Sequence, residues 1–300
     1  MVEWDVQIAE RREKLELCPP GNASRTDALY NLAYSLHQGF LETGNIEELG
    51  EAIELLRSSL DLGPADLPVR HWVLYRLAEC IHGRYHGQGT SPDLEEAIRL
   101  ARAALDLRPE GHSHRSDSLK QLAVCLSDQY DKGGSIADLE EAVTLGRAAL
   151  ELRPPGHSGR AVTLSNLGNY LNARFRKGGA EADLDEAIFL HLSALDLRPQ
   201  GHSDRSNSLH HLAVCFNNRY DKGGSIADLD EANTLGRAAL ELCPPGHFGR
   251  VVILSNLGYY LKNRFREDGV EADFDEAISL YRSALDLRPE GHAYRSDSLN

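Results

Sequence analysis

The sequence contains little of what marks a membrane-spanning, secreted or nucleic-acid-binding protein. No run of about 18 apolar residues occurs, and no basic segment followed by an apolar one begins the chain, so we expect neither a membrane span nor a secretory signal. Basic residues are scarce: 32 Lys and Arg stand against 46 Asp and Glu, a formal net charge of −14. Because nucleic-acid binding relies on basic contacts that release counterions, this charge argues against a nucleic-acid partner. We expect a cytoplasmic protein without a membrane partner.

Cysteines are few, and recognisable catalytic motifs are missing. The five cysteines are odd in number, and Cys80, Cys125 and Cys215 occupy one repeated position, which favours buried thiols in a reducing compartment over a disulfide framework. The patterns G-x-S-x-G, H-E-x-x-H, Q-A-C-x-G and a glycine-rich phosphate loop do not occur. We therefore expect a protein that is not an enzyme, with no catalytic residue and no cofactor.

What the sequence does contain is a period of 45 residues. Gly-His recurs at Gly111-His112, Gly156-His157, Gly201-His202, Gly246-His247 and Gly291-His292. An arginine keeps the same register at Arg25, Arg70, Arg115, Arg160, Arg205, Arg250 and Arg295. A fixed period of about 20–50 residues indicates a solenoid or array rather than a single active-site loop.

Residues 111–155 show what one repeat should form. An apolar stripe with helical spacing runs from Leu119 to Tyr130, and we call the predicted helix helix A. Ser135 with Asp138 has capping-box spacing and predicts a second helix, helix B, which the prolines from Pro154 should end. Helix B carries small residues seven apart, such as Ala142 and Ala149, which allow neighbouring helices to approach closely. The chain should be all-α.

A family resemblance agrees with this interpretation. Leu167-Gly168, Ala187, Ala194 and Pro199 resemble the tetratricopeptide pattern L-G…A…A…P, although that repeat has about 34 residues. Long repeats of this kind resemble the arrays found beside CHAT peptidase or NLR-like domains of fungi and, more distantly, those of kinesin light chain. The fold expected is a right-handed α-solenoid, or superhelix, of antiparallel helix pairs. We expect a capping helix over 1–20, repeats over 21–65, 66–110, 111–155, 156–200, 201–245 and 246–290, and a truncated seventh repeat over 291–300.

Three repeated features admit a structural role more readily than a chemical one. Stacked repeats would separate the Gly-His histidines by about 10 Å, whereas zinc needs its ligands about 2.0–2.3 Å from one point, so we expect no metal site. Glycine should take a left-handed turn after helix B, and histidine should cap backbone groups.

The repeated arginines should form ion pairs with the acids at Glu51, Glu96, Glu141, Glu186, Glu231 and Glu276. The aromatics that end helix A, Phe40, Tyr85, Tyr130, Phe175, Tyr220 and Phe265, should lie in the core.

The resemblance also implies where a partner would bind. Helix A lines the concave groove of tetratricopeptide arrays, and its ligand-facing positions fall here on residues rich in Asn, His and Tyr. The candidate groove residues are Tyr75, Lys120, Asn166, Asn169, Asn172, His210, Asn217, Asn256, Tyr259 and Lys262, with Tyr30, Tyr34, His37, Trp72, Glu79 and Asp128 in the same register. Asparagine both donates and accepts hydrogen bonds, as an extended peptide requires, and the cations Lys120 and Lys262 favour an acidic peptide end.

The function expected is that of a non-catalytic scaffold or sensor arm for protein–protein interaction, which binds a peptide or partner protein in this groove. One alternative is a regulatory fragment of a larger multidomain peptidase or NTPase, whose other domains would then be its partners. A helical-repeat RNA binder ranks below both because of the net charge of −14. The residues do not identify the partner.

Overall fold

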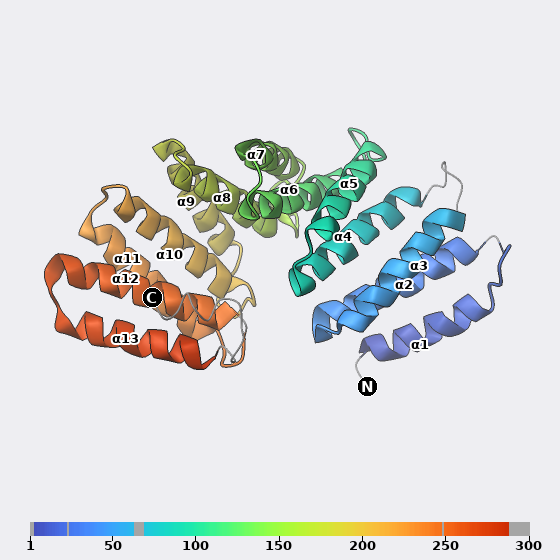
Figure 1. Ribbon diagram of the computed structural model, residues 1–300. Coiled ribbons are helices and arrows are strands. Elements are labelled where there is room, and N and C mark those ends of the chain that lie inside the picture. The colour runs from blue at the N-terminus through green and yellow to red at the C-terminus, as the bar shows by residue number, and fades with distance from the viewer. Residues whose placement is uncertain (1–2, 23, 63–68, 248, 288–300) are drawn as a thin grey trace. The chain divides into compact units, whose positions relative to one another are not determined.

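The computed structural model describes residues 3–22, 24–62, 69–247 and 249–287, and within them the chain forms thirteen α-helices and no strand (Figure 1). This confirms the predicted all-α class. The helices are α1 (Glu3–Glu16), α2 (Arg25–Thr43), α3 (Ile46–Leu62), α4 (Arg70–Gln88), α5 (Ser91–Asp106), α6 (Arg115–Asp131), α7 (Ile136–Glu151), α8 (Arg160–Arg176), α9 (Glu181–Asp196), α10 (Arg205–Asp221), α11 (Ile226–Leu242), α12 (Gly249–Asp268) and α13 (Glu271–Asp286).

The helices pack in two compact units, residues 1–153 and residues 154–300, which we call unit 1 and unit 2. In unit 1, α1 packs on α2, and each later helix packs on the one before it through α7. In unit 2, the same sequential packing runs from α8 to α13. Each predicted 45-residue interval holds one helix A and one helix B, α1 lies in the predicted capping segment, and the predicted seventh repeat (291–300) lies outside the described residues.

The connector after each helix B is a left-handed glycine turn closed by a histidine. Gly111, Gly156, Gly201 and Gly246 have φ between 84° and 91°, a region that a side chain disfavours. The Nδ1 atom of the next residue then accepts a hydrogen bond from the backbone N–H two positions on, at 3.0 Å for His157 and 3.1 Å for His202. Both expectations for Gly-His, a turn and a cap, are confirmed.

The repeated arginines have a different role from the one we expected. The Nη1 atom of Arg115 donates to the carbonyl of Arg108 at 2.6 Å, and that of Arg205 donates to the carbonyl of Arg198 at 2.6 Å. Each arginine therefore caps the carboxyl end of the preceding helix B, where the helix dipole favours a cation. The prediction that these arginines pair with the repeated acids is wrong.

Four of those acids pair instead with an arginine on the preceding helix B or, for Glu51, on α1. The pairs are Arg12–Glu51, Arg57–Glu96, Arg102–Glu141 and Arg237–Glu276, each 39 residues apart. Because these side chains are partly exposed, each pair should contribute no more than about 1 kcal/mol. They fix neighbouring helices B in register rather than dominate stability.

The structure also buries three arginines that the sequence analysis did not single out. Arg108, Arg153 and Arg198 stand directly before the prolines that end helix B and are almost fully buried. The Arg198 guanidinium donates to Ser165 at 2.9 Å and to Ser208 at 2.6 Å, and that of Arg153 contacts Asp117 at 2.5 Å. These side chains join the end of one helix pair to the helices A around it.

Small residues bring helices A and B together, as predicted. Ala142, Ala149, Ala187 and Ala194 have no exposed surface. Gly168 of α8 lies so close to His191 of α9 that a Cβ atom at Gly168 would be 2.7 Å from Nε2 of His191. In the corresponding place of the last helix pair, a Cβ at Gly258 would lie 3.1 Å from the Tyr281 ring. Glycine on helix A thus makes room for a large side chain on helix B.

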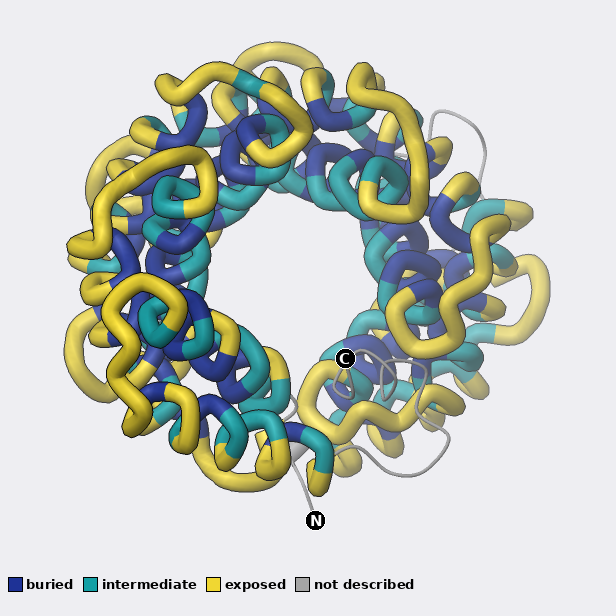
Figure 2. The backbone as a smooth tube through the Cα atoms, turned by 60° about the vertical axis from the view of Figure 1, so that its left-hand side comes forward, coloured by how far each residue is buried: buried dark blue, intermediate teal, exposed yellow. Residues whose placement is uncertain are grey.

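Within each unit, the core consists of buried residues along the helices, while most connector residues are exposed (Figure 2). It includes Cys80, Cys125 and Cys215, which have no exposed surface and form no disulfide. Burial raises the pKa of the Cys125 and Cys215 thiols to about 12, so neither is a thiolate at neutral pH. The prediction of buried thiols at this position is confirmed.

The predicted capping box forms at Ser135–Asp138, and an equivalent box forms at Ser225–Asp228. Each is reciprocal: the Asp228 carboxylate accepts a hydrogen bond from the Ser225 N–H at 2.9 Å, while the Ser225 side chain caps the N–H of Asp228. At Ala180, the residue before α9, no such side chain exists.

Ser225→Ala should lower the free energy of unfolding by about 1 kcal/mol, because it removes the acceptor for one helix N–H. Ala180→Ser is the matched control and should raise it by a similar or smaller amount. Urea unfolding followed by circular dichroism measures both. Equal stability of the two variants and the parent would contradict a capping role.

Candidate partner-binding face

The predicted groove residues lie on helices A, distributed over the two units. Tyr75 and Lys120 are on α4 and α6 of unit 1. In unit 2, Asn166, Asn169 and Asn172 are on α8, His210 and Asn217 are on α10, and Asn256, Tyr259 and Lys262 are on α12. Residues three or four apart share one side of a helix, so each set marks one side of its helix.

The predicted groove residues differ in how far their side chains are exposed. Tyr259 is 40 % exposed, and Lys120, Asn166, Asn169, His210, Asn256 and Lys262 are half-buried. Tyr75, Asn172 and Asn217 are 7 %, 9 % and 5 % exposed, so the expectation that they are exposed groove side chains is wrong. Two of them bond to neighbouring side chains instead: Asn172 accepts a hydrogen bond from Asn218 at 2.8 Å, and the Asn217 amide donates to Asp221 at 3.0 Å.

In unit 1 the predicted face is a packed polar network between α2 and α4. The Tyr75 hydroxyl donates to Glu79 at 2.6 Å, and the Arg76 guanidinium donates to the same carboxylate at 2.7 Å. Arg76 also lies 3.2 Å from Nδ1 of His37 and over the ring of Tyr34. Burial lowers the pKa of His37 to about 4. These side chains bind one another, so most of their hydrogen-bonding groups are already occupied.

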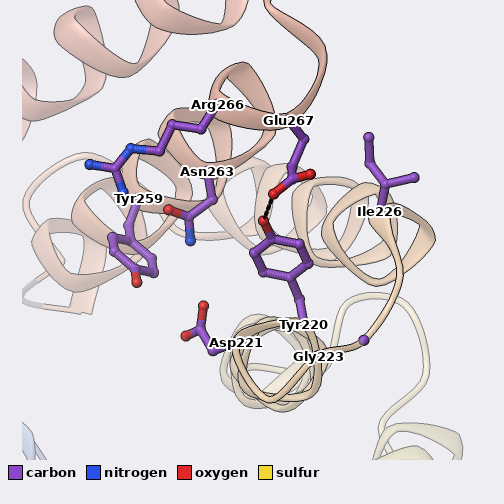
Figure 3. Close-up of a pocket in the computed structure, with 9 residues that line it drawn as sticks. Tyr220, Asp221, Gly223, Ile226, Tyr259, Asn263, Arg266 and Glu267 are labelled. Atoms are coloured by element: carbon purple, nitrogen blue, oxygen red, sulfur yellow. Dashed lines mark hydrogen bonds between the residues drawn. The ribbon is translucent and has the colours of Figure 1, made fainter.

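Unit 2 contains an open pocket of about 540 Å³ between the end of α10, the loop that follows it, and α12. Tyr220 and Asp221 stand on one side of it, and Tyr259, Asn263 and Arg266 stand on the other (Figure 3). The Tyr220 hydroxyl donates to the carboxylate of Glu267 across one edge, which raises the pKa of Tyr220 to about 12. Burial raises the pKa of the Asp221 carboxyl.

The aromatics that end helix A only partly follow the prediction of a core position. Tyr85 and Phe175 are buried, whereas Phe40, Tyr130, Tyr220 and Phe265 are half-exposed. Tyr220 is a pocket residue that the sequence analysis therefore missed. Tyr220 precedes Tyr259 by 39 residues in the sequence, the same separation as in the Arg57–Glu96 ion pair between neighbouring repeats. This separation was the sequence signal that could have placed Tyr220 beside Tyr259.

One group of possible metal ligands is found among the described residues: His82, His86 and Asp128 in unit 1. None of these is a Gly-His histidine. The cluster joins α4 to α6.

Two repeat families match the chain. The tetratricopeptide repeat family matches residues 160–195 and 251–294, and the Sel1 repeat family matches residues 26–64 and 73–108. Each described match covers a helix A together with its helix B or most of it. These segments of the chain are tetratricopeptide-like and Sel1-like repeats. Repeats of this kind generally mediate protein–protein interaction, and such scaffolds are typically non-catalytic. No curated protein matches this tetratricopeptide-like chain.

Solved structures have the same fold at low sequence identity. Kinesin light chain TPR-like repeats from Podospora anserina are 18 % identical, with a TM-score of 0.52 over 73 % of this chain and 94 % of that one. The C-terminal part of a TPR repeat-containing protein from Cytophaga hutchinsonii is 14 % identical, with a TM-score of 0.53 over 99 % and 98 %. A monomeric IFIT1 mutant with Gppp-AAAA is 17 % identical, with a TM-score of 0.61 over 99 % and 57 %. These likenesses support the solenoid fold.

The hydropathy of the helices agrees with the lack of long apolar runs in the sequence. Among the described residues, every helix is too short or too polar to span a bilayer.

Proposed function

We propose that this tetratricopeptide-like chain is a non-catalytic scaffold that binds a peptide or partner protein along helices A of unit 2. The observation that carries the proposal is Tyr259, a predicted groove residue that is exposed and lines the pocket between α10 and α12. A rigid tyrosine beside an open pocket is a typical anchor for a partner side chain, because it offers a large contact area at a low entropy cost.

The charge of the pocket favours one kind of side chain. Asp221 and Glu267 contribute two carboxylates against the single guanidinium of Arg266, and the whole chain is acidic. A lysine or arginine of the partner would therefore be attracted, rather than the acidic end expected from Lys120 and Lys262. Asn166, Asn169 and Asn256, half-buried on α8 and α12, have both donors and acceptors for a peptide backbone.

Peptides selected from a randomised display library on the immobilised chain provide the test. The double variant Asn169→Ala with Tyr259→Ala should weaken their binding by about tenfold or more, since the loss of a tyrosine anchor typically costs 2 kcal/mol or so. Its melting temperature should change little, because exposed side chains contribute little packing. Fluorescence anisotropy of a labelled peptide measures the affinity.

Tyr130→Ala is the matched control, because Tyr130 ends α6 in unit 1 at the register of Tyr220. Unchanged binding in the double variant, or equal loss in the control, would sink the groove assignment. Retention of a single-stranded RNA probe at physiological salt would favour the RNA alternative instead. Hydrolytic turnover abolished by one substitution would favour a fragment of a peptidase or NTPase.

A further inference from the structure

The polar face of unit 1 contains two histidines one helical turn apart on α4. His82 and His86 belong to the segment His82-Gly83-Arg84-Tyr85-His86, whose H-x-x-x-H spacing places both imidazoles on one side of a helix. Their ring centroids lie 4.5 Å apart. The segment lacks the glutamate of H-E-x-x-H, so a motif search does not find it.

A carboxylate from the next helix A completes the cluster. The Oδ2 atom of Asp128, on α6, lies 2.6 Å from Nε2 of His82 and 3.1 Å from Nε2 of His86. One ligand atom from each of the three side chains falls within 4.8 Å of the others. A zinc ion at bond lengths of about 2.0–2.2 Å holds tetrahedral ligands about 3.4 Å apart, so small side-chain rotations would admit it.

The surroundings suit an ion that arrives from solvent. The His82 side chain is 11 % exposed, that of Asp128 22 % and that of His86 57 %, so the cluster is anchored on one side and open on the other.

The same place in unit 2 lacks this chemistry. Positions 90 residues further on are Asn172, Arg176 and Asn218, and there Asn218 donates to Asn172 at 2.8 Å. An Asn–Asn hydrogen bond is sufficient to join two helices A in this geometry. The two imidazoles and one carboxylate of unit 1 are therefore not required for packing alone.

We propose that His82, His86 and Asp128 bind a divalent transition metal ion that links α4 to α6. Two imidazoles and a carboxylate favour Zn²⁺, Ni²⁺ or Cu²⁺ over Mg²⁺ or Ca²⁺, which prefer oxygen ligands. Three protein ligands leave a coordination position for water on the exposed side. Metal binding requires each Nε2 atom to be unprotonated.

Calorimetric titration of the chelator-treated full chain with Zn²⁺ tests this site. We expect saturable binding of one Zn²⁺ per chain, weakened at least about 100-fold by His86→Asn, since even outer-shell changes cost about 10–100-fold. His157→Asn, in an exposed connector, is the control and should bind as the parent does. Zn²⁺ should also raise the melting temperature of the parent and the control, but not that of His86→Asn.

A second variant distinguishes loss of the metal ligands from misfolding of the chain. His82→Asn with Asp128→Asn copies the native Asn172–Asn218 pair of unit 2, so it should fold and lose the zinc-dependent shift in melting temperature. His86 is exposed, so its substitution should not unfold the chain. No saturable binding by the parent, or undiminished binding by His86→Asn or the double variant, would overturn the proposal and leave a simple histidine–aspartate ion pair.

Discussion

Acidification from pH 6.5 to pH 4 should lower the free energy of unfolding of unit 2 by about 3 kcal/mol through His191 alone. His191 of α9 has no exposed surface, and neither ring nitrogen has a hydrogen-bond partner. Burial, together with His211, Arg198 and His210, lowers its pKa from 6.5 to about 3. The folded chain therefore holds this imidazole neutral, whereas the unfolded chain protonates it near pH 6.5.

The sign of the effect follows from this difference. A pKa that is depressed in the folded state means that stability is complete above pH 6.5 and is lost as the pH falls toward 3. His210 and His211 add to the loss, since burial lowers their pKa values to about 3 and about 4. The rings of His191 and His211 are stacked 5.6 Å apart, so protonating one disfavours protonating the other.

Urea unfolding of the parent and of His191→Gln at several pH values measures this contribution. The variant keeps a similar volume but does not titrate, so its stability should fall by about 1.4 kcal/mol less per pH unit below pH 6. His202→Gln, in an exposed connector, should follow the parent. Parallel pH profiles for the parent and His191→Gln would contradict the assignment.

The helices could be predicted because the signals for them are local. The Gly-His turn, the capping box at Ser135 and the proline that ends helix B each depend on residues within one connector. Because the sequence repeats every 45 residues, the same signals predict the helices of each repeat. Buried Cys125 and Ala142 follow in the same way, since helical spacing decides which side of a helix faces its partner.

The site could be predicted only in part, because side chains along one helix or on adjacent elements bind one another. Tyr75 and Asn217 occupy the predicted ligand-facing register, yet Glu79 and Asp221 bind their polar atoms, and both side chains are buried. The partner of each repeated arginine was misassigned for the same reason. A periodic pattern shows that Arg115 recurs, but not whether its guanidinium reaches a glutamate or the nearer carbonyl of Arg108.

Spacing between repeats would have recovered some of these contacts. His82–Asp128 and Asn172–Asn218 both join residues 46 apart, and the helix B ion pairs join residues 39 apart. These offsets follow from how one helix pair stacks on the next, which depends on packing rather than on any local motif. The metal cluster and the Tyr220–Tyr259 pocket both arise from such offsets.

Packing between α8 and α9 leads to the second large effect, which concerns Gly168. Gly168→Ala should lower the free energy of unfolding by about 1–3 kcal/mol, because the new Cβ would lie 2.7 Å from Nε2 and 2.9 Å from Cε1 of the fully buried His191. Helix propensity alone predicts the opposite, since alanine in a helix is favoured over glycine by up to about 1 kcal/mol. The clash should outweigh that gain because His191 has no free space to move into.

A double-mutant cycle separates the two contributions. In a His191→Gly background the obstructing ring is gone, so Gly168→Ala should become neutral or stabilising, and the coupling energy should be about 1–3 kcal/mol. Gly50→Ala on α3 is the matched control: a Cβ there meets no atom within 4 Å, so it should stabilise unit 1 by up to about 1 kcal/mol. Urea unfolding of the four chains of the cycle gives the coupling directly. A cost at Gly168 that persists without the imidazole would mean that backbone strain, and not the exchange of volume between helices A and B, fixes glycine at this position.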